Sequence, residues 1–277
     1  SKAGRRGNPT SQEEDEEQEP PPQEVEDNPP KAEIASDQPE EKAEDEATAY
    51  FANITHASKK AVNVLNNLKD EVVIAAESHL NREASLKLIS ECRMHDRNAA
   101  ATPAIANSEE HDGYSAGMFI TTLRSCDARF LQCGADSLCA NPRLIATAMM
   151  CGDVTVVITG IYLYVGMGIK GENIDLLLRL EALSDDGRRC VIAPGDYNVT
   201  AEAMEETGIL KALGITLIRP SNVDITWHLG KGSLIAYVLV PSKYVPLIKS
   251  VKADAIVPWA PHSGIRVTLH SKCDQIT

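Results

Sequence analysis

The 277-residue chain carries a formal net charge of −13, and almost all of this charge belongs to its first part. Sixteen of the 40 acidic residues and only five of the 27 basic residues precede residue 50, so residues 50–277 carry a charge of −2. A nearly neutral folded part excludes the strong positive potential that drives tight, sequence-independent binding of nucleic acids. No apolar run approaches the roughly 18 residues of a membrane span, and no signal-peptide pattern is present, so we expect an intracellular protein, cytoplasmic or nuclear.

Residues 1–47 hold seven of the fifteen prolines, an acidic run at residues 13–17 and almost nothing apolar. Such a segment buries too little surface to offset the entropy of ordering it, which predicts a disordered acidic linker whose partner is unknown. Residues 48–272 are long enough for one domain with a sizeable core, and residues 273–277 form a short tail. The seven cysteines are odd in number and contain no Cys-x-x-Cys, so neither a disulfide framework nor a zinc site is predicted.

Strand-like and helix-like segments alternate along residues 48–272. Short apolar runs predict strands, and apolar residues spaced three and four apart predict helices. The predicted strands cover residues 49–54, 71–76, 117–123, 130–133, 154–164, 190–193, 216–218, 224–227, 234–240 and 265–269. The predicted helices cover residues 57–68, 82–92, 173–183 and 201–213, the last with a break near Gly208. Helices and strands interleaved early, with mostly strands late, predict α/β layers that hold mixed sheets.

The tetrapeptide Gly195-Asp196-Tyr197-Asn198 follows an apolar run that is typical of a buried strand. At the exit of a strand, a carboxylate and a carboxamide two residues apart can both face one small ligand. Asp196 can accept a proton or hold a cation, and Asn198 can donate to a phosphoryl oxygen. The tetrapeptide therefore indicates phosphate-ester chemistry, although the same residue types also dominate ordinary turns and that interpretation stays open.

Residues 166–171, Gly-Met-Gly-Ile-Lys-Gly, form a literal Gly-x-Gly-x-x-Gly between a predicted strand and a predicted helix. This pattern can bind the pyrophosphate of a dinucleotide at the start of a helix, with an acid about 20 residues further on that binds the ribose. Asp185 and Asp186 lie near that offset, but in a turn-like stretch. A dinucleotide-binding oxidoreductase is therefore an alternative hypothesis, beside the interpretation of residues 166–171 as a flexible loop.

Six polar residues lie at or near the ends of predicted strands: Asn53, Glu77, Tyr162, Asp196, Asn198 and His262. Polar residues at strand ends can converge at one rim of a sheet sandwich. Taken singly, each has a structural interpretation, because Glu77 is equally typical of a solvated acid and Tyr162 of a core tyrosine. Their joint order along the chain favours one shared site.

This order resembles the metal-dependent endonuclease/exonuclease/phosphatase superfamily and is most similar to endonuclease domains of non-LTR retrotransposons. The strand with Asn53 is similar to the family's opening strand-Asn motif. Ala-Glu-Ser-His-Leu at residues 76–80 resembles its Gln-Glu-Thr-His-Leu block. Further similarities are Ile-Tyr-Leu at residues 161–163 to Val-Tyr-Leu, residues 195–198 to Gly-Asp-Phe-Asn, Thr226-Trp227 with residues 233–237 to Thr-Trp and Ser-x-Ile-Asp-Tyr, and residues 261–263 to Asp-His-x.

The resemblance implies a DNase I-like layered sandwich of two mixed β-sheets flanked by helices. It also implies a divalent-metal-dependent phosphodiesterase or endonuclease that acts on DNA, in which Glu77 binds Mg²⁺ or Mn²⁺. In the family mechanism Asp196 would deprotonate a water molecule, and His262 would stabilise the developing charge. Tyr162, Asn198 and Asn53 would hold the phosphate.

Two positions depart from the family pattern. Ala236 stands where the family has the aspartate that orients the catalytic histidine, and Pro261 stands where it has a second acid beside the metal. Because Glu77 is then the one clear metal carboxylate, weak metal binding is expected. His262 also loses the carboxylate that would orient it and stabilise its charged form. A non-catalytic binding module or relic of the same fold is therefore an alternative hypothesis.

Overall fold

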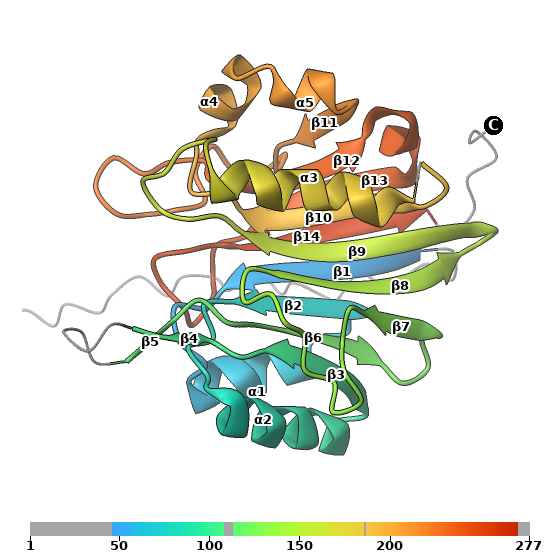
Figure 1. Ribbon diagram of the computed structural model, residues 1–277, viewed down its shortest axis with the longest axis vertical. Helices are drawn as coiled ribbons and strands as arrows, with labels where there is room; N and C mark the ends of the chain where they lie inside the picture. The colour runs from blue at the N-terminus through green and yellow to red at the C-terminus, as the bar shows by residue number, and fades with distance from the viewer. Residues whose placement is uncertain (1–45, 108–112, 186, 271–277) are drawn as a thin grey trace, which may run out of the picture. The chain divides into compact units, whose positions relative to one another are not determined.

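Two six-stranded mixed β-sheets pack face to face, and helices cover their outer faces (Figure 1). This computed structural model of the chain describes residues 46–107, 113–185 and 187–270. The predicted α/β sandwich of two mixed sheets is confirmed. Apart from residues 46 and 47, the predicted linker over residues 1–47 lies outside the described residues, as does the predicted tail over 273–277.

The first sheet carries the N-terminal half of the domain and also its last two strands. Its strands, in spatial order, are β13 (Ile248–Asp254), β14 (Gly264–His270), β1 (Glu46–Asn53), β2 (Val72–Ala76), β6 (Met118–Leu123) and β3 (Arg97–Thr102). Only β1 and β2 run parallel, because helix α1 (Lys59–Asn67) connects them; α2 (Arg82–Met94) follows β2. Ser58 and Asn81 begin these helices, since their side chains accept the backbone N–H of Ala61 and Ala84.

The second sheet is built in the same way around one parallel pair. Its strands, in spatial order, are β11 (Ile215–Ile218), β12 (Ala236–Pro241), β10 (Cys190–Asp196), β9 (Val154–Tyr162), β8 (Leu144–Cys151) and β7 (Ala128–Leu131). Helix α3 (Glu172–Ser184) connects the parallel strands β9 and β10. The remaining elements are α4 (Ala201–Glu206), α5 (Ile209–Ala212), the 3-10 helix η1 (Ser242–Leu247) and the small hairpin of β4 (Ile105–Ala106) and β5 (Tyr114–Ser115).

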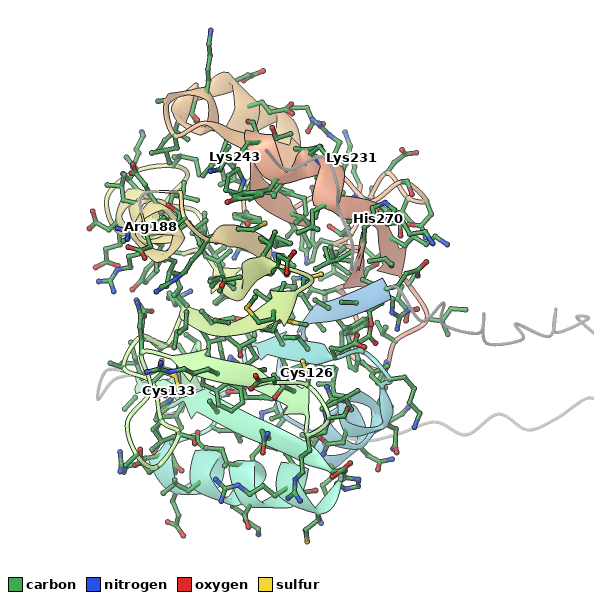
Figure 2. The ribbon with its side chains drawn as sticks, turned by 90° about the vertical axis from the view of Figure 1, so that its right-hand side faces the viewer. Cys126, Cys133, Arg188, Lys231, Lys243 and His270 are labelled. Carbon is green, nitrogen blue, oxygen red and sulfur yellow. A yellow bond between two sulfur atoms is a disulfide. The ribbon has the colours of Figure 1, made fainter. Side chains whose placement is uncertain are left out.

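Aliphatic side chains fill three core layers, as the low aromatic content requires. One layer lies between the sheets, one between the second sheet and α3 to α5, and one between the first sheet and α1 and α2. Figure 2 shows these layers from the side. The sheets approach most closely at Gly160, where a Cβ atom would lie 2.4 Å from Cγ2 of Ile74. Any larger residue at position 160 would therefore push the sheets apart.

Most predicted elements are present, but the sequence analysis missed three long strands and predicted one that is absent. β3, β8 and β13 were missed because their alanine, methionine and lysine residues hide the alternation typical of strands. The predicted strand over residues 224–227 is wrong, since the segment is a loop that touches the rest of the domain through isolated bridges at Trp227. The predicted break near Gly208 is confirmed, because this glycine separates α4 from α5 with φ of 72°.

The cysteine prediction is partly wrong. Cys133 and Cys139 form a disulfide, which closes a short loop after β7 and which spacing alone does not reveal. Cys92, Cys151 and Cys190 are buried, as expected of small apolar residues. Cys273 lies outside the described residues. Within the described residues, no helix is long and apolar enough to cross a membrane.

Arg97, the first residue of β3, is a buried charge that ties together the end of the first sheet opposite the strand ends of β1 and β2. Its guanidinium donates to Oγ1 of Thr121 at 2.7 Å and to the carbonyl oxygens of Leu68 at 3.1 Å and Asp70 at 2.9 Å. Burial lowers the pKa of this group. These three hydrogen bonds are what makes the buried guanidinium tolerable.

We therefore expect Arg97→Leu to lower the free energy of unfolding by about 3 kcal/mol, because it leaves two buried carbonyl groups without donors. Urea denaturation followed by circular dichroism measures the loss. Arg93→Leu, at an exposed position on α2, is the control and should change stability by less than about 0.5 kcal/mol. Equal effects of the two substitutions would contradict the role given to Arg97.

Candidate functional site

The candidate site lies at the rim where the parallel strands of both sheets end. Asn53 ends β1, Glu77 follows β2, Tyr162 ends β9 and Asp196 ends β10. Two hydrogen bonds cross from one sheet to the other. Nδ2 of Asn53 donates to Oδ2 of Asp196 at 2.8 Å, and the hydroxyl of Tyr162 donates to Oε1 of Glu77 at 2.5 Å.

Asp196 is fully buried at the centre of this rim. Its Oδ1 accepts the backbone N–H of Asn198 at 3.1 Å, and Oδ2 lies 3.5 Å from Nδ1 of His262. Burial raises the pKa of Asp196, and the nearby charge of Glu77 adds to this rise. His262 and the hydrogen bonds from Asn53 and Asn198 oppose it. The carboxyl group is therefore easier to protonate than an ordinary aspartate, which suits a group that accepts a proton.

Glu77 is the accessible acid of the site, with 19% of its side chain exposed. Its backbone has φ of 55°, a left-handed conformation that costs a non-glycine residue free energy and is often found at functional sites. Burial and the charge of Glu77 raise the pKa of Tyr162, so this phenol stays protonated and donates its hydrogen to the carboxylate. His79 lies at the edge, with Nε2 3.9 Å from Oε1 of Glu77.

His262 faces Asp196 but lacks the partner that would orient it. Nδ1 is buried and forms no hydrogen bond, because its 3.5 Å approach to Asp196 does not have hydrogen-bond geometry. Ala236 pairs directly with Asp196 across β10 and β12, and its side chain belongs to the apolar layer between the sheets. The predicted loss of an orienting carboxylate at position 236 therefore coincides with an unpartnered nitrogen on His262.

His228 holds the segment around His262, and the sequence analysis missed it. Its backbone N–H donates to the carbonyl oxygen of Pro261 at 3.0 Å, and Nε2 lies 2.7 Å from Oγ of Ser263. His228 therefore contacts both neighbours of His262 along the chain. Its place directly after Thr226-Trp227, already recognised as a motif, was the available signal.

Arg143 is a second residue that the sequence analysis missed. It precedes β8, and its guanidinium carbon lies 4.7 Å from the ring centroid of Tyr162 and 3.8 Å from that of Tyr164. These contacts place a positive charge beside the phenol that binds Glu77. Without the missed strand β8, nothing in the sequence links Arg143 to Tyr162, although the backbone N–H of Tyr162 donates to the carbonyl oxygen of Arg143.

Asn198 belongs to the site mainly through its backbone. Its side-chain Nδ2 donates to the carbonyl oxygen of Leu163 at 2.8 Å, so this amide joins the ends of β9 and β10. The second N–H of the amide and its oxygen have capacity for further hydrogen bonds. Its predicted contact with phosphate therefore stays a prediction.

The acidic side chains of the rim are suited to a weakly held Mg²⁺ or Mn²⁺ ion. Within the described residues, no three His, Cys, Asp or Glu side chains form a metal-binding group. Magnesium commonly uses only one or two protein carboxylates and completes its shell with water and substrate phosphate. Glu77, partly exposed and next to the buried charge of Asp196, fits that mode.

Comparison with solved structures identifies the architecture. An AP endonuclease from Leishmania major matches with a TM-score of 0.62 and 12% identity over 82% of this chain and 88% of the other. The endonuclease domain of TRAS1, a telomere-specific non-LTR retrotransposon, matches with a TM-score of 0.60 and 14% identity over 82% and 100%. The chain has the DNase I-like fold of the endonuclease/exonuclease/phosphatase superfamily. A 3′ phosphatase from Neisseria bound to a product DNA hairpin also matches this DNase I-like domain, with a TM-score of 0.56 and 14% identity over 80% and 98%. No protein-family model and no curated protein sequence matches the chain.

The glycine-rich loop at residues 166–171 connects β9 and α3 of the DNase I-like domain. Asn173 closes this loop, because its side chain accepts the backbone N–H of Tyr164 and donates to the carbonyl oxygens of Tyr164 and Gly168. The loop therefore has a structural role in the connection between the two strands. Dinucleotide binding at this position stays a prediction.

The buried charge of Asp196 predicts a measurable effect on stability. Its pKa is raised in the folded state, so the folded protein binds a proton more readily than the unfolded chain, and the ionised carboxylate lowers stability at neutral pH. Asp196→Asn removes this charge and should raise the free energy of unfolding at pH 7 by on the order of 1 kcal/mol. The difference should shrink as the pH falls through the raised pKa and vanish below the unfolded value. Thermal denaturation of both proteins between pH 4 and pH 8 tests this, and a variant less stable than the parent at pH 7 would refute it.

Proposed function

We propose that this domain hydrolyses phosphodiester bonds of DNA with the help of a divalent metal ion. The observation that carries the proposal is the convergence of Asn53, Glu77, Tyr162, Asp196 and His262 at one rim. These side chains come from both sheets and are joined by hydrogen bonds and close charges. Such a set offers a base, a metal carboxylate and hydrogen-bond donors within one site.

Asp196 would act as the general base. Its raised pKa brings it closer to neutral pH, where proton transfer from water is more favourable. Asn53 fixes the carboxylate from the other sheet, so the oxygen that accepts the proton has a defined position. Glu77 would hold Mg²⁺ or Mn²⁺, and this ion would supply neutralisation of the phosphoryl oxygens.

The substrate phosphate would lie among the donors at the rim. Tyr162 keeps its phenolic proton, and Arg143 places a guanidinium beside it. Arginine is well suited to phosphate because its planar fork can donate two parallel hydrogen bonds. His262, when protonated, would add positive charge where negative charge develops. The DNA hairpin bound by the Neisseria 3′ phosphatase of the same fold supports DNA as the substrate class.

Plasmid nicking tests the proposal. The purified domain should convert supercoiled plasmid to the open circle in the presence of Mg²⁺ or Mn²⁺ and should stop when EDTA is added. Asp196→Asn should lower the rate by about 100-fold or more, because the general base is lost while the shape of the site remains. Asp153→Asn, at the exposed turn between β8 and β9, is the matched control and should cleave at the parent rate. Cleavage that survives Asp196→Asn would show that another group or a contaminant is responsible.

A second candidate is a non-catalytic DNA-binding module. The specific observation in its favour is the unpartnered Nδ1 of His262 beside Ala236. An imidazole without a carboxylate partner has neither a defined orientation nor stabilisation of its charged form. On this hypothesis the domain binds DNA without cleaving it.

Restoring both acids separates the two candidates. If the domain is a non-catalytic module, the parent should not nick plasmid at any metal concentration, and Ala236→Asp combined with Pro261→Asp should introduce metal-dependent nicking. The carboxylate at position 236 would lie opposite Asp196, where cross-strand Cβ atoms are about 5 Å apart, and could pair with His262. Nicking by the parent protein rules out the module, whereas inactivity of both proteins, with the fold intact by circular dichroism, argues that more than these two acids has been lost.

A further inference from the structure

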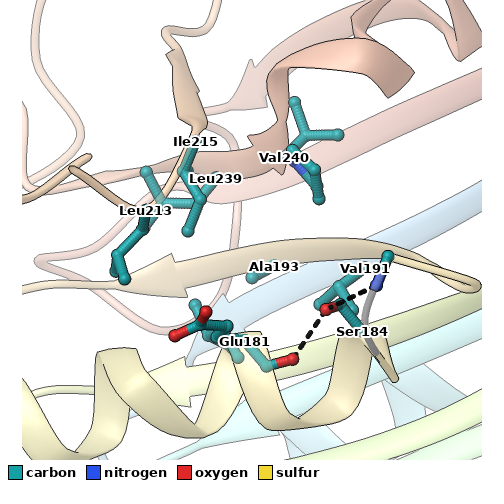
Figure 3. Close-up of a pocket in the computed structure, with 11 residues that line it drawn as sticks. Glu181, Ser184, Val191, Ala193, Leu213, Ile215, Leu239 and Val240 are labelled. Carbon is teal, nitrogen blue, oxygen red and sulfur yellow. Dashed lines mark hydrogen bonds between the residues drawn. The ribbon is translucent and has the colours of Figure 1, made fainter. Parts of the chain in front are cut away.

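A cavity of about 240 Å³ opens between helix α3 and the outer face of the second sheet (Figure 3). Its walls are mostly apolar and come from α3, the strands β10, β11 and β12, and the end of α5. The apolar side chains that form them include Leu180, Val191, Ala193, Leu213, Ile215 and Leu239. The cavity lies on the face of β10 that points away from the layer between the sheets.

The cavity arises because α3 and α5 do not meet over the sheet. Leu176, Leu177, Leu180 and Leu183 hold α3 on β9 and β10, but the small side chain of Ala193 leaves space beside Leu180. Protein interiors rarely leave a void larger than a water molecule, so an open cavity of this size is a candidate ligand site. An apolar cavity of about 150 Å³ is already large enough to bind benzene in another protein.

Glu181 supplies the one carboxylate of the described cavity wall. Its carboxylate points from α3 toward strand β10 (Figure 3), and none of the described residues forms a hydrogen bond or ion pair with it. Ser184, the neighbouring polar residue, is occupied, because its hydroxyl bonds to the carbonyl oxygen of Glu181 and accepts the backbone N–H of Gly187. The nearby ammonium of Lys243 donates to the carbonyl oxygen of Gly187 at 2.8 Å.

We infer that this cavity binds a small cationic amphiphile, with an apolar body against the leucine and isoleucine side chains and an ammonium group at Glu181. The apolar walls exclude a strongly polar ligand, and the carboxylate disfavours an anion. The available volume admits one aromatic ring or a short alkyl chain with its ammonium group.

This inference does not rest on the proposed nuclease activity. Val191, at the cavity, and Asp196, at the rim, are five residues apart on β10, which is about 17 Å along a strand. The side chains that form the cavity do not overlap with those of the rim. A ligand in the cavity can therefore be detected whether or not the domain cleaves DNA.

Titration with benzylamine, followed by backbone NMR, tests the inference on the whole domain. Benzylamine should bind with a dissociation constant on the order of 1 mM and shift amide signals of Leu180, Ala193 and Leu239. Benzyl alcohol, which has the same ring without the charge, should bind less tightly. Glu181→Gln should weaken benzylamine binding by about threefold and leave benzyl alcohol unchanged, as expected of a partly exposed ion pair. Glu206→Gln, an exposed glutamate on α4, is the matched control and should change neither.

Ile215→Trp provides a second variant, because a tryptophan at the edge strand β11 fills the cavity. It should abolish binding of both compounds, with the fold checked by the amide spectrum. The inference is overturned if benzylamine produces no shifts at these amides up to 10-fold above the expected constant, or if the alcohol binds as tightly as the amine. It is also overturned if Glu181→Gln binds benzylamine like the parent, since the carboxylate would then have no part in recognition.

Discussion

The carboxylate of Asp196 is fully buried at the point where the two sheets meet, and the rest of the site is arranged around it. A buried charge is costly unless hydrogen bonds and opposite charges surround it. Asn53 provides a donor from the other sheet, the Asn198 backbone provides one from the same chain segment, and His262 provides an adjacent imidazole. Because these groups come from β1, from the turn after β10 and from the segment before β14, the fold of the whole domain determines the state of this one side chain. Its raised pKa is the consequence.

The half of the rim that carries His262 is held by the backbone and by neutral groups. His228 contacts Pro261 and Ser263, the two neighbours of His262, while Ala236 continues the apolar layer beside Asp196. An aspartate at position 236 would place a second negative charge directly across the strands from Asp196, which raises the cost of burial unless His262 is protonated. The present sequence avoids that repulsion but leaves Nδ1 of His262 without a partner. This balance distinguishes a phosphodiesterase with a simplified site from a module that only binds.

Local patterns in the sequence predicted most elements of the fold because their apolar residues follow the period of a strand or a helix. The break at Gly208 could be predicted for a similar reason, since glycine readily adopts the positive φ that separates α4 from α5. β3 and β8 could not be recognised in this way, because runs of alanine and methionine have no strong strand preference and become strands only by pairing with β6 and β9. The loop over residues 224–227 shows the opposite error, in which an apolar residue pattern was not matched by a pairing partner.

The sequence by itself determined that polar residues follow several strands in a defined order, and so it indicated the α/β sandwich and the candidates Asn53, Glu77, Tyr162, Asp196 and His262. It could not determine their contacts, because these residues are separated by up to about 200 positions and meet only when two sheets stack. The tertiary structure decided that Tyr162 binds Glu77, that Asn53 binds Asp196 and that the Asn198 side chain turns to Leu163. It also added His228 and Arg143, which no local pattern links to the site. The physical reason is that hydrogen bonds and desolvation depend on distances in space, whereas periodicity and motif order record only neighbours along the chain.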